Sequence, residues 1–253
     1  MQSALMTAKR KRHYVRFSLR TMLVVLTAFA VWLGVQANRA NRQRAVVRWV
    51  TENGGWVHYD WQFHKRNGID IFISGNRPPG PAWLRRQIGD DYFQSVVGIG
   101  AEVDDVSPLV GLSSLESLYI DGPVNDLTPL ARLSRLKRLG LTATRVRDLS
   151  PLVDLSDLEV LHLNESPVGD LAPLRKFIRL EELSLANTQA RNLSPLTRLP
   201  QLRILYLDRN QVADLESLAG LSSLTDLRIH DPLFSDDRLR ELQRTLPKIR
   251  VSR

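Results

Sequence analysis

The sequence predicts an α/β solenoid whose short strands stack into one parallel sheet, and two phrases repeated at a fixed period indicate this fold. A period near 22 residues is typical of a repeat protein whose units stack in a row. The first phrase, an acidic or amide residue followed by x-x-Pro-Leu or a close variant, recurs at intervals of 21, 22, 22, 22 and 22 residues, at Asp105, Asp126, Asp148, Asp170, Asn192 and Asp214. The second, Leu-x-x-Leu-x-(Leu or Ile), begins at Leu115, Leu136, Leu158, Leu180, Leu202 and Leu224.

The strand of each repeat is predicted from the second phrase. Its alternating leucines point to one side of the sheet, while the residues between them point to the other. One repeat alone cannot bury its leucines, so several repeats must stack to form a core. A further inward-facing row is expected from the turn before each strand, at Leu112, Leu133, Leu155, Phe177, Leu199 and Leu221.

The return path of each repeat is predicted to be a short helical turn, because 22 residues leave no room for a full helix. A proline suits the start of such a turn, since it fixes φ and needs no amide partner there. The sheet then forms the concave face and short 3-10 turns form the convex face. We expect the Asp/Asn series to cap these turns and not to bind metal. The residues before the prolines are also predicted to act as caps, at Ser107, Thr128, Ser150 and Ser194.

The whole unit, L-x-x-L-x-x-L-x-L-x-x-(T/N/S)-x-V-x-D-L-S-P-L, resembles the short leucine-rich repeat of bacterial proteins such as internalin ectodomains. The resemblance covers about residues 97–229. It implies a curved binding module without catalytic activity, but that fold serves many ligands, so it does not identify one.

Both ends of the stack are predicted to carry caps that cover the open edge strands. The first strand is expected within residues 90–103, with Val97 and Ile99 aligned on Leu118 and Ile120. Ahead of it, strands over 56–63 and 69–74 are predicted to form a hairpin, followed by a short helix that starts at Pro81.

At the C-terminal end, a helix is predicted to open at Ser235 and to close the stack. After this helix, Leu246, Ile249 and Val251 repeat the spacing of the strand residues, which aligns Ile249 with Leu227.

The N-terminal part predicts a membrane anchor, because residues 21–38 carry no charge. As a helix they span about 27 Å, close to the thickness of a bilayer's hydrocarbon core. Six Lys and Arg residues precede this segment and four follow it, which favours a cytoplasmic N-terminus and extracytoplasmic repeats in a single-pass protein of the cell membrane. A signal peptide cleaved near Val35–Ala37 is the alternative.

The chain is therefore divided into five predicted parts. These are a basic tail (1–20), a transmembrane helix (21–38), a juxtamembrane helix with a hairpin and N-terminal cap (39–95), the leucine-rich repeats (96–230) and a C-terminal capping repeat (231–253).

Composition argues against a nucleic-acid partner although the formal net charge is +8. Residues 1–50 hold ten Lys and Arg and no acid, so 25 basic and 27 acidic residues remain, a net charge of about −2 for the rest. The chain contains no Cys, no phosphate-binding loop and no His pair at metal-ligand spacing. We therefore expect no cofactor, no metal and no enzymatic activity.

Function is expected on the concave face, where the residues between the leucines are not used by the core. Aromatic, apolar and charged side chains mix there, as in protein contacts. A protein ligand is the first hypothesis; a carbohydrate or cell-wall ligand and a structural self-assembly role are the alternatives, and the oligomeric state stays open. The predicted contact residues are Tyr119, Arg138, Val160, His162, Asn164, Glu182, Ile204, Tyr206, Asp208, Arg228 and His230.

Overall fold

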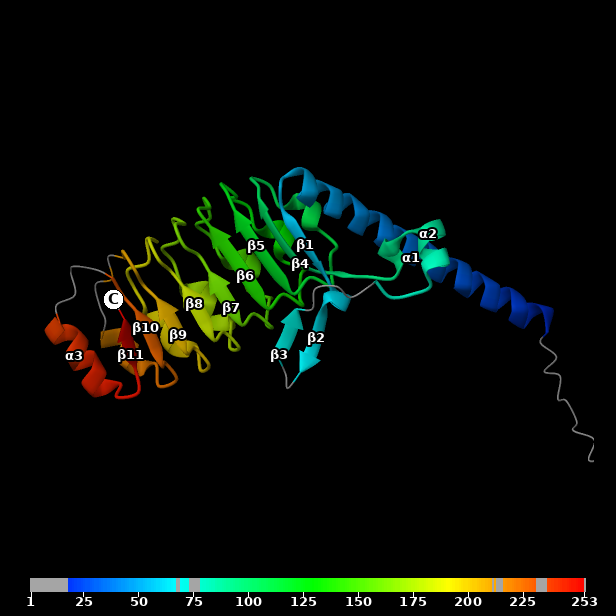
Figure 1. Ribbon diagram of the computed structural model, residues 1–253. Helices are drawn as coiled ribbons and strands as arrows, with labels where there is room; N and C mark the ends of the chain where they lie inside the picture. The colour runs from blue at the N-terminus through cyan, green and yellow to red at the C-terminus, as the bar shows by residue number, and fades with distance from the viewer. Residues whose placement is uncertain are drawn as a thin grey trace, which may run out of the picture. The chain divides into compact units, whose positions relative to one another are not determined.

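The computed structural model describes residues 18–66, 69–72, 78–210, 212, 216–230 and 236–252 (Figure 1). The chain divides into two compact units, residues 1–39 and 40–253. The second unit is a solenoid built on a nine-stranded sheet in the order β1-β4-β5-β6-β7-β8-β9-β10-β11. These strands are β1 (Trp56–Tyr59), β4 (Val96–Glu102), β5 (Ser117–Asp121), β6 (Arg138–Thr142), β7 (Val160–His162), β8 (Glu182–Ser184), β9 (Ile204–Tyr206), β10 (Asp226–Arg228) and β11 (Arg250–Ser252).

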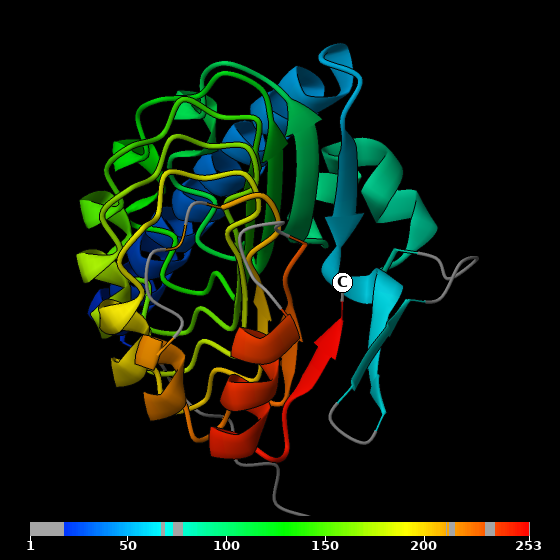
Figure 2. The same ribbon diagram turned by 90° about the vertical axis from the view of Figure 1, so that its left-hand side faces the viewer.

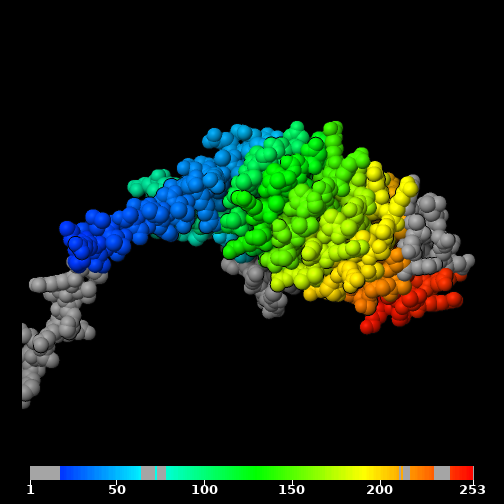
Figure 3. All heavy atoms as spheres, turned by 180° about the vertical axis from the view of Figure 1, so that it is seen from behind, coloured from blue at the N-terminus to red at the C-terminus, as the bar shows by residue number. Residues whose placement is uncertain are grey.

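Neighbouring strands from β4 to β11 run parallel, as the repeat predicts. Between β5 and β9 the repeated leucines lie directly side by side, so that Leu139 pairs with Leu161 and Leu161 with Leu183. Both phrases contribute to one continuous core, and the inward-facing row predicted from the preceding turns is buried throughout. The α/β solenoid is therefore confirmed, with its coils stacked in sequence order (Figure 3).

The 3-10 turns lie on the side of the coil opposite the sheet (Figure 2). The Asp/Asn series caps them as predicted: Asp148 Oδ1 accepts a hydrogen bond from the Ser150 amide at 2.8 Å. The predicted caps at Ser107, Thr128, Ser150 and Ser194 are wrong, because these residues are the first residues of the turns and donate their amides to the Asp or Asn two positions earlier. The turns are Ser107–Leu109, Thr128–Leu130, Ser150–Leu152, Ala172–Lys176, Ser194–Arg198 and Glu216–Gly220.

The first parallel strand, β4, lies where it was predicted but in a different register. Ile99 pairs with Leu118 and Ala101 with Ile120, so the predicted alignment of Val97 with Leu118 is wrong by two residues. The connection from Ile99 to Leu118 covers 118 − 99 = 19 positions, shorter than the later repeats. A slip of two residues keeps every side chain on its own face, which is why the core is still filled.

The C-terminal cap shows the opposite slip. Val251 pairs with Leu227, so the predicted alignment of Ile249 with Leu227 is also wrong by two residues. This connection covers 251 − 227 = 24 positions because it contains helix α3 (Asp236–Thr245), which was predicted. Leu242, Leu246 and Ile249 are buried in the core, so the last unit covers the end of the stack.

The segment before the solenoid differs from the predicted hairpin. The strand expected over 56–63 is two strands, because a 3-10 turn at Asp60–Gln62 interrupts it. β1 pairs antiparallel with β4 and joins the main sheet, whereas β2 (Phe63–Arg66) forms a hairpin with β3 (Ile69–Phe72). Residues 73 and 74 of the second predicted strand lie outside the described part. The predicted short helix is α2 (Ala82–Ile88).

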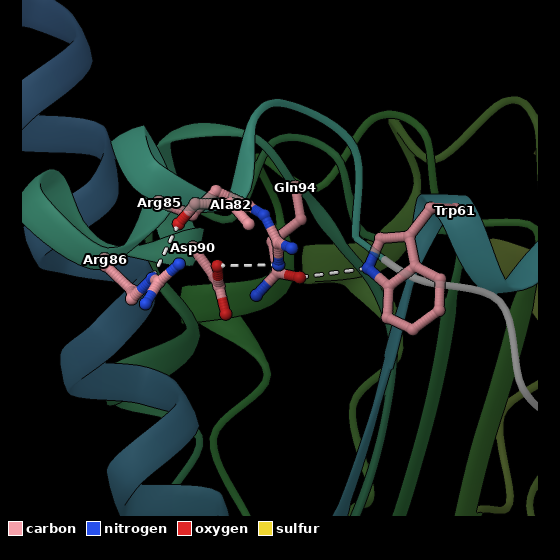
Figure 4. Close-up of polar contacts among 6 residues, drawn as sticks. All are labelled: Trp61, Ala82, Arg85, Arg86, Asp90 and Gln94. Atoms are coloured by element: carbon pink, nitrogen blue, oxygen red, sulfur yellow. Dashed lines mark hydrogen bonds and ion pairs between the residues drawn. The ribbon is translucent and has the colours of Figure 1, made fainter.

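Polar contacts hold this cap together (Figure 4). The Trp61 indole Nε1 donates to Gln94 Oε1 at 2.9 Å, and Arg85 forms an ion pair with Asp90 at 3.2 Å. Gln94 also accepts, through its backbone oxygen, a hydrogen bond from Gln43 of helix α1 (Leu19–Glu52). Trp61 therefore has a packing role in the cap.

Helix α1 contains the predicted transmembrane segment and continues without a break, so the structure has one helix where a separate juxtamembrane helix was expected. Within the second unit, its residues Ala40, Val46 and Val50 are buried. In the described part of the chain, α1 is the one helix long and apolar enough to cross a membrane.

Candidate binding surface

The side chains between the leucines of β4–β10 point away from the core and form what we call the sheet face. The parallel register places them in rows across the strands, as predicted. Pairing of Trp56 with Gly100 places β1 at the start of the central row. That row consists of Trp56, Gly100, Tyr119, Gly140, His162, Ser184, Tyr206 and Arg228.

Charged pairs dominate the C-terminal half of the sheet face. Arg228 Nε lies 3.0 Å from Asp208 Oδ2, and the other carboxylate oxygen of Asp208 accepts the His230 amide at 2.7 Å. The Arg228 side chain is 58% exposed although it is paired, so it stays accessible to a ligand. The structure thus brings together the predicted contact residues Asp208, Arg228 and His230.

Tyr206 lies beside this charged group in the central row and is half-buried. Burial raises the pKa of its hydroxyl above the usual value, and the nearby Glu182 carboxylate raises the pKa further. The phenol is therefore a neutral donor and acceptor at physiological pH, on a ring anchored to the sheet.

The apolar patch expected from Tyr206, Ile204 and Val160 is not continuous. Glu182 lies between Val160 and Ile204 in the same row. Its carboxylate is paired with His162, whose Nε2 lies 2.9 Å from Glu182 Oε1. A charged pair thus divides the patch into two half-buried apolar positions.

Asn164 is committed to the sheet more than the sequence suggested. Its side-chain oxygen accepts a hydrogen bond from the Ser184 hydroxyl and another from the Ala186 amide at 3.2 Å. Its polar groups therefore stabilise neighbouring coils. Arg138 is half-buried and lies beside Val160 in the outer row.

Two aromatic rings lie flat on the N-terminal half of the sheet face, and glycines make this possible. A Cβ atom at Gly100 would lie 2.3 Å from the Trp56 indole, and one at Gly140 would lie 2.7 Å from the Tyr119 ring. The centroids of the two rings are 6.1 Å apart, with 41° between their planes. Together the rings form an aromatic wall on the sheet.

Sequence reasoning did not place Trp56 or Glu102 among the contact residues. Trp56 was assigned to a hairpin, because nothing in its own strand shows that its partner is β4. Glycine inside a strand often marks a close approach of another group. Gly98 and Gly100 within β4 were therefore the available signal.

No described group of three or more His, Asp or Glu side chains could hold a metal ion. The carboxylates of the Asp series cap successive turns, each occupied with an amide of its own repeat, as at Asp126 and Asp170.

Comparisons with known proteins agree with this architecture. A family model described as Leucine Rich repeats (2 copies) matches residues 178–220. The crystal structure of internalin C2 from Listeria monocytogenes is similar to the chain, with 29% identity and a TM-score of 0.55 over 65% of this chain and 74% of that one. The repeats are bacterial, internalin-like leucine-rich repeats.

Two further solved structures match smaller shares of their own chains. An internalin (inlF) from Listeria monocytogenes is 31% identical, with a TM-score of 0.49, over 51% of this chain and 38% of that one. A leucine-rich repeat protein from Leptospira interrogans is 23% identical, with a TM-score of 0.53, over 61% and 41%, and shares the fold. The chain thus spans well under half the length of these two proteins. No curated protein sequence matches the chain.

Leucine-rich repeats generally mediate protein–protein interaction, and internalin-like repeats are typically non-enzymatic. These general properties bear on the class of function and leave the ligand open.

Proposed function

We propose that the protein is a membrane-anchored, non-catalytic binding module that holds a protein ligand on its sheet face, the side predicted to be concave. One observation carries this proposal. The core uses one side of each strand, while the other side presents an uninterrupted array of aromatic, charged and small side chains from β1 to β10. Such a mixture, with aromatic and Arg side chains near its centre, is typical of protein interfaces.

Tyr206 and Arg228 are the residues that we expect to contribute most in the C-terminal half. They are neighbours in the central row, because β9 pairs with β10 in register. Tyr and Arg are the residue types most often found at energetic hot spots of interfaces. The Asp208 carboxylate orients the Arg228 guanidinium, which reduces the conformational entropy lost when a ligand binds.

The anchor is proposed from residues 21–38 of α1. Their side chains are exposed in the described structure, and the helix is long and apolar enough to cross a bilayer. The excess of positive charge before this segment supports a cytoplasmic N-terminus with the repeats outside the cytoplasm.

The proposal is tested with the full chain in detergent micelles, used to capture extracellular and cell-surface proteins. We expect the double substitution Tyr206→Ala and Arg228→Ala to weaken capture of a bound protein about tenfold or more, the range of hot-spot substitutions. Arg175→Ala is the control, because Arg175 is an exposed arginine on a convex turn.

Unchanged capture by the Tyr206/Arg228 variant would contradict a sheet-face site. If instead the variant bound protein normally but lost retention on cell-wall polysaccharide, the carbohydrate alternative would replace the protein ligand.

A further inference from the structure

We propose that a groove at the N-terminal end of the sheet face binds a cationic side chain, Lys or Arg, of the protein ligand. This inference rests on the proposed function, since it assigns the chemistry of one contact on that face. The main groove-lining side chains are Trp56, Glu102, Tyr119, Asp121, Thr142 and His162.

The aromatic wall of the groove is prepared for a cation. The faces of Trp and Tyr rings attract a cation that lies within about 6 Å of the ring centroid. Because Gly100 and Gly140 leave no side chain beneath them, the Trp56 and Tyr119 rings rest on the backbone and turn their other surfaces outward. Trp56 is 41% exposed, so part of the indole is open to a ligand.

Two carboxylates give the groove its charge. Glu102 and Asp121 are direct neighbours across β4 and β5, and both are exposed. Like charges that face each other on neighbouring strands destabilise a sheet. A cation placed between these carboxylates and the rings would relieve that repulsion.

The pairing of the other acids on the sheet face sets this pair apart. Glu182 is paired with His162, Asp208 with Arg228, and Asp226 accepts a hydrogen bond from the Thr225 hydroxyl. Within the described structure, neither Glu102 nor Asp121 forms an ion pair or a side-chain hydrogen bond, and no Lys or Arg lines the groove. The missing partner is a positive charge.

A cation fits this groove better than a neutral sugar does. A sugar ring would stack on an indole, but it would leave the two negative charges uncompensated. A Lys ammonium or Arg guanidinium satisfies the carboxylates with charge-assisted hydrogen bonds and contacts the rings at the same time.

The test follows the Trp56 indole N–H signal by NMR in the full chain in zwitterionic micelles. Probes are Nα-acetyl-lysine amide, Nα-acetyl-arginine amide and the neutral matched analogue Nα-acetyl-norleucine amide. We expect saturable shifts with the two cations, little shift with norleucine, and affinity that falls as salt rises, because exposed charges are screened. Trp56→Phe identifies the signal among those of the other indoles.

The double substitution Glu102→Gln and Asp121→Asn is expected to weaken binding of both cations about fivefold or more, since an exposed carboxylate–cation contact contributes up to a similar factor each. The control Asp154→Asn removes one negative charge from an exposed acid on a convex turn and should leave binding unchanged. Equal binding of norleucine and lysine, binding unaffected by the double substitution, or saturable binding of a neutral chitin oligosaccharide in place of the cations would overturn the inference.

Failure of this inference and failure of the proposed function are separable. The Tyr206/Arg228 variant should bind the cationic probes normally, because those residues do not line the groove. Protein capture that depends on Tyr206 and Arg228, without cation binding at Trp56, would overturn the cation site and leave the proposed function standing.

Discussion

Leu161 shows how a single repeated leucine supports the stack. It is fully buried and pairs with Leu139 on one side and Leu183 on the other. We expect Leu161→Ala to lower the free energy of unfolding by about 2–5 kcal/mol, through lost burial and the cavity that remains. Urea denaturation followed by circular dichroism measures this change.

Ile178→Ala is the matched control, because Ile178 is 57% exposed on the outside of a coil. Its effect should stay within about 0.5 kcal/mol, as for most surface substitutions. Similar losses from both variants would mean that the leucine ladder is not the main source of stability.

The capping aspartates predict an acid-dependent loss of stability. The pKa values of Asp105 and Asp148 lie below the usual value because the hydroxyl and amide of the Ser two positions later donate hydrogen bonds to the carboxylate. A lowered pKa in the folded state stabilises the fold above the unfolded value of 3.8, and this contribution disappears as pH falls through the folded pKa.

We therefore expect Asp105→Asn with Asp148→Asn to be slightly less stable than wild type at neutral pH and to lose less stability in acid. Asn192 shows that an amide oxygen can accept the same backbone hydrogen bond, at 2.9 Å. Urea midpoints at about pH 7 and pH 3 measure the difference between the proteins. A gap that stays constant or widens in acid would contradict the assignment.

Individual positions were predictable where burial decides them and less so where hydrogen bonds do. The repeated leucines could be assigned to the core because their spacing allows one inward face. The role of Ser150 could not, because the sequence does not show whether its hydroxyl accepts or its amide donates. Glu182 was placed on the sheet face correctly, but its pairing with His162 depends on side-chain geometry that spacing alone does not fix.

The strands and turns of the interior follow the sequence closely, whereas the two caps depart from it. Between β5 and β10 a constant period fixes the register. At β4 and β11 the connections differ in length, and a slip of two residues preserves the inward and outward faces, so the hydrophobic pattern fits either register. The pairing of β1 with β4 was missed for a related reason, since a strand's sequence does not identify a distant partner.

Helix α3 and strand β11 are expected to protect the last coil. Leu242 in α3 is buried in the common core, whereas the adjacent Gln243 is exposed. Leu242→Ala should therefore lower the urea midpoint and increase binding of a dye that reports exposed apolar surface, since terminal coils need a cover. Gln243→Ala should change neither measurement; equal effects would show that α3 does not seal the stack.

The arrangement of charge along the chain supports the proposed topology. All residues of the first 50 that carry charge are basic, whereas the remainder is close to neutral. Treating intact cells with protease should digest the repeats and leave an N-terminal fragment protected by the membrane. Survival of the repeats until the cells are permeabilised would reverse the orientation, and release of intact repeats into the medium without protease would favour the cleaved signal peptide.

Antiparallel β1 has a consequence for how this protein diverges among relatives. Its opposite direction ends the series of parallel coils at β4, so a duplicated coil can be inserted only further along the chain. Gain or loss of coils would change the reach of the distal surface and the ligands that it accepts. Trp56 and Tyr119 would keep their separation from the apolar helix in residues, so this proximal contact can be inherited unaltered while the rest of the footprint evolves.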